Sequence, residues 1–165
     1  MPVLKKQKTF DLERTYAAPV AAVWRAWTEP DLLARWWGPD KTFVPECTLD
    51  LRVGGEIALV MEAGPEMGRY AGTRWPMAGT FTEIEEHARL VWSARSWTDG
   101  KDDVTTIEHV NTVTFTEVEG GTHVRLDVAI SAIGAKARMA AFGMKWGYKA
   151  QLGRLDGVLE PAPAG

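Results

Sequence analysis

Residues 9–17 alternate between apolar and polar side chains, the pattern of a β-strand with one buried face. Six more segments with a period of two predict six more strands, near residues 43–52, 55–62, 76–85, 88–97, 106–117 and 122–130. Glycine pairs at 54–55 and 120–121 suit hairpin turns, because glycine adopts positive φ without a steric penalty. The pattern therefore predicts a seven-stranded antiparallel sheet.

Apolar residues at helical spacing predict helices after the first strand and at the C-terminal end. Pro19 begins the first helix, because a proline at the first helical position loses no hydrogen bond. Its apolar stripe contains Val20, Val23, Trp24 and Trp27. A second, short helix extends through Trp36. A long final helix is expected over residues 135–160, with an apolar stripe made by Met139, Phe142, Trp146, Leu152, Leu155 and Leu159.

Four glycines interrupt this final helix, and each costs about 0.5–1 kcal/mol relative to alanine in a helix interior. They are Gly143, Gly147, Gly153 and Gly157. One interpretation is that they permit close packing of the helix on the sheet or on a partner. The other is that this segment bends or opens to admit a ligand.

A chain of 165 residues suits one domain, which we expect at residues 9–160, with flexible ends at 1–8 and 161–165. One strand, two helices, six strands and a long helix make an α+β domain.

The net charge of −3 and the scattered lysines and arginines give no basic patch for nucleic acid. No apolar run approaches the roughly 20 residues of a membrane-spanning helix, and no signal peptide is evident, so we expect no membrane insertion. Cys47 is the only cysteine, which suits a reducing compartment and predicts a cytoplasmic protein with a buried, inert thiol. Eight tryptophans indicate a large aromatic core, a ligand site, or both.

Residues 106–117 place a histidine and an amide on an apolar strand face. Counting back by two from Val113 puts Asn111 and His109 on the same face as Ile107. A buried polar group needs a partner, because an unpaired one costs about 1–3 kcal/mol. Three roles are open: a hydrogen bond between neighbours, orientation of a ligand, or proton transfer.

The strand at 88–97 carries two alternative inward sets. Leu90, Trp92 and Ala94 share one face, and Arg95 and Trp97 share the other. We expect Trp92 to face inward and keep Trp97 as a candidate for the mouth of a cavity. The loop before the strand at 76–85, residues 63–74, is either an ordinary connector or a binding element whose Arg69, Tyr70 and Arg74 hold an anionic ligand.

The three histidines, His87, His109 and His123, share no metal-ligand spacing. No nucleophile elbow, phosphate-binding loop or dinucleotide fingerprint appears. We therefore expect no metal and no cofactor, and assign no catalytic residue.

Ten short segments, in order along the chain, resemble one known family. They are Ala18-Pro19, Val23-Trp24, Ala26-Trp27-Thr28-Glu29-Pro30, Trp36-Trp37-Gly38-Pro39, Leu51-Arg52-Val53-Gly54-Gly55-Glu56, Gly79-Thr80-Phe81, Arg89-Leu90-Val91-Trp92, Val113-Thr114-Phe115, Gly121-Thr122 and Leu152-Gly153-Arg154-Leu155. The family is that of the bacterial relatives of the heat-shock chaperone ATPase activator, within the SRPBCC superfamily. The resemblance implies the helix-grip fold of START-like and pollen-allergen-like proteins, a curved seven-stranded sheet around a long C-terminal helix with a cavity between them.

The resulting hypothesis is an intracellular carrier or sensor of an apolar or aromatic small molecule held in that cavity. The expected ligand-binding residues are Trp75, Met77, Trp92, Trp97, His109, Asn111, Met139, Phe142 and Trp146. One alternative is an enzyme that uses the same cavity for isomerase, cyclase or hydrolase chemistry. The other is a protein-interaction module, either a homodimer or a chaperone accessory, for which a patch of exposed tryptophan would be the mark.

Overall fold

A computed structural model describes the backbone of residues 3–159 and the side chains of residues 9–159. The elements are β1 (Val3–Tyr16), α1 (Val20–Thr28), α2 (Pro30–Trp36), β2 (Thr42–Leu49), β3 (Glu56–Ala63), the 3₁₀ helix η1 (Pro65–Tyr70), β4 (Arg74–Glu85), β5 (Arg89–Ser96), α3 (Asp102–Thr105), β6 (Ile107–Val118), β7 (Gly121–Ile133) and α4 (Arg138–Val158).

All seven predicted strands and the three predicted helices are present, and the sequence missed only the short η1 and α3. The first strand begins at Val3, earlier than residue 9, because its N-terminal part continues to pair with β7. The predicted flexible tail at 161–165 lies outside the described residues.

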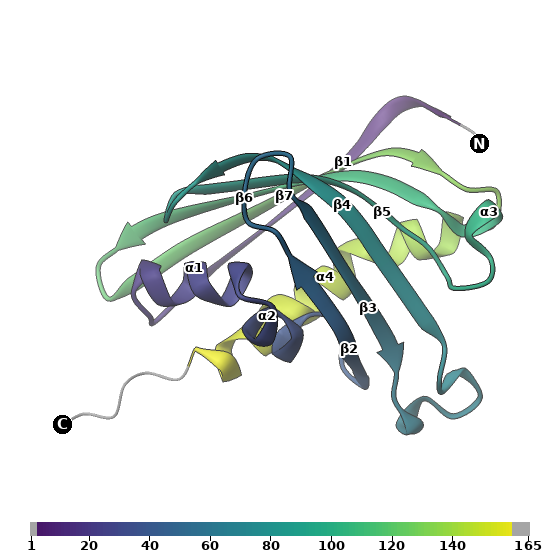
Figure 1. The fold of residues 1–165 in the computed structure, drawn as a ribbon, viewed down its shortest axis with the longest axis horizontal. Coiled ribbons are helices and arrows are strands. Elements are labelled where there is room, and N and C mark those ends of the chain that lie inside the picture. Colours follow the sequence, from purple (N-terminus) through teal and green to yellow (C-terminus); the bar gives the residue numbers. More distant parts are fainter. Residues whose placement is uncertain (1–2, 160–165) are drawn as a thin grey trace.

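The strands form one antiparallel sheet in the order β1-β7-β6-β5-β4-β3-β2. Figure 1 shows this sheet arching over α4, with α1 and α2 on the same concave side. The α+β helix-grip architecture is therefore confirmed.

A cluster of aromatic rings fills the space between α1, α2 and the sheet. The ring of Trp27 lies 4.6 Å from that of Trp36 and 6.2 Å from that of Trp92, and the indole N–H of Trp36 donates to the carbonyl of Ala26 at 2.9 Å. Trp24 packs edge-on against Phe115 of β6. These tryptophans are core residues, and Trp92 belongs with them.

The inner face of β6 agrees with the prediction. Ile107, His109, Asn111, Val113 and Phe115 are all buried. The register shift beside His109 is an extra residue in β7, since Glu108 pairs with Ala132 and His109 with Ile130. The irregularity therefore leaves the alternation along β6 intact.

The apolar stripe predicted for α4 is partly wrong. Met139, Phe142 and Trp146 are 83%, 71% and 65% exposed and lie on the outer face of the helix. The face that packs under the sheet contains Ala141, Tyr148, Gln151, Leu152 and Leu155. The buried face therefore includes two polar side chains, Tyr148 and Gln151. Their burial is possible because each has a hydrogen-bond partner, Asn111 of β6 for Tyr148 and Gly38 after α2 for Gln151.

The glycines of α4 do not mediate close packing within the described chain. A methyl group added at Gly143, Gly147, Gly153 or Gly157 would meet no atom within 4 Å. Close packing of these glycines on the sheet, one part of the first interpretation, is therefore excluded. The glycines lower the helix propensity of α4 without gaining a packing contact with the sheet.

Candidate functional site

An apolar cavity of about 270 Å³ lies between the N-terminal half of α4 and the strands β3, β4 and β5. The segment after α2 and the residues around α3 complete its wall. The side chains that line it are mostly aromatic, aliphatic or thioether groups: Trp37, Pro39, Leu59, Met61, Trp75, Met77, Trp97, Ile107, Ala137, Ala140 and Met144. A wall of this composition favours a ligand with a large apolar surface.

Trp97 reaches the cavity because β5 ends one residue before it. Ser96, the last residue of the strand, already lines the cavity, and Trp97 does so as well. Two consecutive residues could not do this in a regular strand, where successive side chains point to opposite faces. Trp92 and Trp97 therefore both face inward, but only Trp97 reaches the cavity, while Trp92 is enclosed by the aromatic cluster.

Four side chains form a hydrogen-bonded chain from α4 to the cavity wall. The Tyr148 hydroxyl donates to Oδ1 of Asn111 at 3.3 Å, and Nδ2 of Asn111 lies 2.9 Å from Nδ1 of His109. Nε2 of His109 lies 2.9 Å from Oγ of Ser96. Because Ser96 and Tyr148 line the cavity while His109 and Asn111 do not, the two middle groups connect with a ligand only through their neighbours.

Burial sets the protonation of this chain. Desolvation lowers the pKa of His109 to about 4. Burial also raises the pKa of Tyr148 well above its usual range. Both groups are therefore uncharged near neutral pH, and the neutral His109 ring carries one donor and one acceptor nitrogen.

Gln151 and Arg154 connect α4 to the segment after α2. The backbone N–H of Gly38 donates to Oε1 of Gln151 at 2.9 Å. Arg154 donates to the carbonyls of Gly38, Pro39 and Thr42 at 2.9, 3.0 and 3.3 Å. Gly38 has φ of +93°, a conformation that favours glycine, so this turn depends on both its sequence and its anchors.

The cavity includes three of the nine predicted ligand-binding residues, namely Trp75, Met77 and Trp97. His109 and Asn111 stand behind its wall, and Trp92 lies in the core. Met139, Phe142 and Trp146 do not line the cavity, because they lie on the side of α4 that faces solvent. That part of the predicted site is wrong.

Sequence reasoning missed several cavity residues that lie far apart in the chain. They are Trp37, Pro39, Leu59, Met61, Ser96, Ile107, Met144, Tyr148 and Gln151. The alternation of β3 does give one usable pattern, since Leu59 shares the buried face with Ile57. Tyr148 and Gln151 carried no local pattern that would have selected them.

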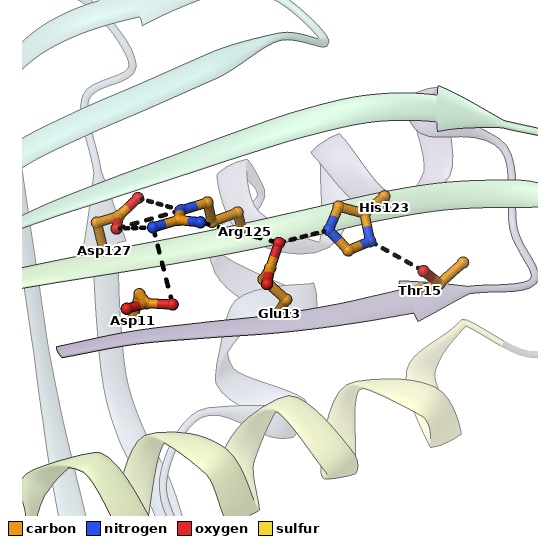
Figure 2. A network of polar contacts seen from close by, with 6 residues as sticks. All are labelled: Asp11, Glu13, Thr15, His123, Arg125 and Asp127. Atoms are coloured by element: carbon orange, nitrogen blue, oxygen red, sulfur yellow. Dashed lines mark hydrogen bonds and ion pairs between the residues drawn. The ribbon is translucent and has the colours of Figure 1, made fainter.

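A second polar cluster lies on the opposite, exposed face of the sheet, between β1 and β7 (Figure 2). Arg125 donates to both carboxylate oxygens of Asp127 and lies near Asp11 and Glu13. His123 contacts Glu13 at 3.1 Å and Thr15 at 2.9 Å. Because acidic and basic groups pair with one another on an open surface, the cluster forms no enclosed site.

The other candidate groups are accounted for by local contacts. Arg74 pairs with Glu62 and Glu46, and Arg69 contacts Tyr70. These three candidates for holding an anionic ligand, Arg69, Tyr70 and Arg74, do not line the cavity. Burial raises the pKa of the Cys47 thiol to about 11, and the charge of Asp31 makes a smaller contribution. The thiol is therefore protonated near neutral pH.

Within residues 3–159, no group of three His, Cys, Asp or Glu side chains is arranged to hold a metal ion. Among the helices described, none is both long enough and apolar enough to cross a membrane.

Comparison with solved structures shows the same fold in bacterial proteins. A protein of Chromobacterium violaceum matches with a TM-score of 0.74 and 23% identity, covering 93% of this chain and 98% of its own. A protein of Rhizobium leguminosarum matches with a TM-score of 0.77 and 21% identity, covering 96% and 98%. A protein of Nitrosomonas europaea is 27% identical, with a TM-score of 0.69 and coverage of 92% and 93%.

Sequence comparison agrees with this fold. No curated protein gives a significant match. The model of the family described as Activator of Hsp90 ATPase homolog 1-like protein, however, matches residues 17–160, which is most of the chain. With its arched sheet, gripped C-terminal helix and intervening cavity, the chain belongs to this family and has its SRPBCC-type fold.

Proposed function

We propose that the protein is an intracellular carrier or sensor that holds an apolar or aromatic small molecule in the cavity under α4. The observation that carries the proposal is the wall itself, in which Trp37, Trp75 and Trp97 surround a space of about 270 Å³. This volume is close to the lower end of the roughly 300–1,000 Å³ of ligand pockets, so the best fit is a small molecule of two or three rings. The proposal includes a cytoplasmic location, in keeping with a single, protonated cysteine.

An enzyme has less support than a binding protein. The proton-transfer candidate His109 has a pKa of about 4 and does not line the cavity. A general acid or base must reach the proton it transfers and works best with a pKa near the operating pH. His109 therefore fits a structural role better than a catalytic one.

The test uses N-phenyl-1-naphthylamine, a neutral apolar fluorophore in which an amine nitrogen joins a naphthalene to a phenyl ring. Native mass spectrometry of the purified protein accompanies it. The wild-type protein should bind the fluorophore with one-to-one stoichiometry. Trp97→Ala should weaken binding by about 2 kcal/mol, or about 30-fold, because one wall of the cavity is removed. Trp146→Ala is the matched control and should bind as wild type does, since Trp146 faces solvent.

Two results would count against the proposal. One is the absence of binding by this fluorophore and by a wider set of aromatic and lipid molecules. The other is an equal loss of affinity in both tryptophan variants, which would place the bound molecule outside the cavity.

A second candidate, a protein-interaction module, is favoured by the outer face of α4. Met139, Phe142 and Trp146 lie there within about 120° of arc together with Arg138, Lys145 and Lys149, as 3.6 residues per turn dictates. No acidic residue occurs between Asp127 and Asp156. An apolar patch bordered by cations suits an acidic partner surface better than an identical copy, whose cations would repel it.

This candidate is tested with a fluorescent peptide of alternating glutamate and leucine, followed by anisotropy. Lys145→Gln/Lys149→Gln should weaken binding, and the matched pair Arg52→Gln/Lys101→Gln, with the same change of charge, should not. Light scattering on the same samples reports self-association. Equal binding by both double variants would remove the interaction face as a candidate function.

A further inference from the structure

We propose that the ligand of the cavity carries a carbonyl oxygen, which accepts hydrogen bonds from the Ser96 hydroxyl and the Gln151 side-chain amide. This inference rests on the proposed function and goes further, since it names the chemical class of the ligand. Its basis is the direction of the hydrogen bonds around the cavity.

The shortest contacts of the chain that starts at Tyr148 assign a direction to its hydrogen bonds. The hydroxyl of Tyr148 is protonated and donates to Oδ1 of Asn111. Nδ1 of His109 lies 2.9 Å from Nδ2 and 3.2 Å from Oδ1 of Asn111, and we assign the hydrogen bond to the closer pair, in which Nδ2 donates. With this assignment the hydrogen of the neutral imidazole is on Nε2, which donates to Oγ of Ser96 at 2.9 Å.

Ser96 is therefore an acceptor toward the protein and a free donor toward the cavity. A hydroxyl has one hydrogen to donate and two lone pairs to accept with. His109 occupies one lone pair, and no described protein group accepts the hydrogen of Ser96. Because Ser96 lines the cavity, this hydrogen is available to a bound molecule.

Gln151 offers a second donor from α4. The N–H of Gly38 can bond only to an oxygen, so it fixes the orientation of the amide with Oε1 toward Gly38. Nε2 then points away and has no partner among the described residues, although the side chain is only 1% exposed. A buried donor without an acceptor is costly, and an acceptor on a ligand would remove that cost.

The remaining polar groups support the same polarity. Thr105 accepts from the N–H of Thr98 and donates to the carbonyl of Lys101, so both of its functions are used. No aspartate or glutamate lines the cavity, whereas the cation Lys136 does. The free side-chain groups are donors, which select an acceptor.

The test compares two probes of nearly the same shape, 2-acetylnaphthalene and 2-isopropenylnaphthalene, in which a C=CH₂ group replaces C=O. Affinities are measured by competition against N-phenyl-1-naphthylamine and expressed as the ratio of ketone to alkene binding. Ser96→Ala and Gln151→Met should each lower this ratio about tenfold, the value of a lost neutral hydrogen bond. Ser93→Ala is the matched control on the same strand, outside the cavity, and should leave the ratio unchanged.

The outcomes separate this inference from the proposed function. If both probes bind and the ratio is the same in wild type, Ser96→Ala and Gln151→Met, the donor inference is overturned while cavity binding stands. If neither probe binds, the proposed function fails. If Gln151→Met does not fold, because Gly38 loses its acceptor, Ser96→Ala alone decides.

Discussion

Protonation of His109 should destabilise the fold strongly in mild acid. Its side chain is 1% exposed, and burial lowers its pKa to about 4, compared with 6.5 for an exposed histidine. Between these two pH values His109 is protonated in the unfolded chain and neutral in the folded chain. The free energy of unfolding therefore falls as pH decreases from about 6.5 to about 4. A difference of about 2.5 pKa units corresponds to about 3 kcal/mol once the pH is below both values. About 2.5 kcal/mol of this is already lost near pH 4.5.

Urea unfolding, followed by circular dichroism near pH 7.5, 5.5 and 4.5, measures this effect. Other groups also titrate in this range, so the informative quantity is the difference from His109→Gln, which cannot become charged but can still bond to Ser96 and Asn111. Wild type should lose about 2.5 kcal/mol more than this variant between pH 7.5 and 4.5. His87→Gln is the control, because the side chain of His87 is 42% exposed, and it should follow wild type. Parallel pH profiles for wild type and His109→Gln would refute the reasoning.

Three other substitutions test the packing around α4. Gly143→Ala should raise the free energy of unfolding by about 0.5–1 kcal/mol, because the added methyl group meets no atom and the helix interior gains propensity; thermal unfolding measures it. Arg154→Gln should cost about 1–3 kcal/mol and speed hydrogen exchange at residues 38–42, because three carbonyls lose a charged donor; unchanged exchange there would contradict the anchoring role. Leu155→Ala should cost about 2–5 kcal/mol in urea unfolding, since this fully buried side chain leaves a void, and a loss below 1 kcal/mol would show that the helix is not gripped there.

The strands were predictable from the sequence for a physical reason. An antiparallel sheet with one face on the core and one in water forces a period of two, and β6 shows that period along most of its length. The inward positions of His109 and Asn111 followed from it. The pattern could not reveal that β5 ends at Ser96, which is what brings Trp97 into the cavity.

The faces of α4 were less predictable, because apolar spacing alone does not distinguish a core stripe from an exposed one. Phe142 and Trp146 have helical spacing and aromatic side chains, yet they face solvent. Tyr148 and Gln151 are polar, yet they are buried. Their partners, Asn111 and Gly38, are remote in sequence, so the compensation that permits this burial appears only when the chain is folded.

The aromatic cluster also has an optical consequence. Trp27 lies within 6.5 Å of the rings of Trp36, Trp37 and Trp92, and Trp37 in turn lines the cavity. Excitation energy passes between neighbouring indoles by dipole coupling, which is efficient at such short separations. A ligand in the cavity that absorbs at the wavelengths of tryptophan emission would therefore quench the fluorescence of tryptophans that it does not contact. Intrinsic fluorescence should report occupancy of this protein with high sensitivity, even when no side chain moves.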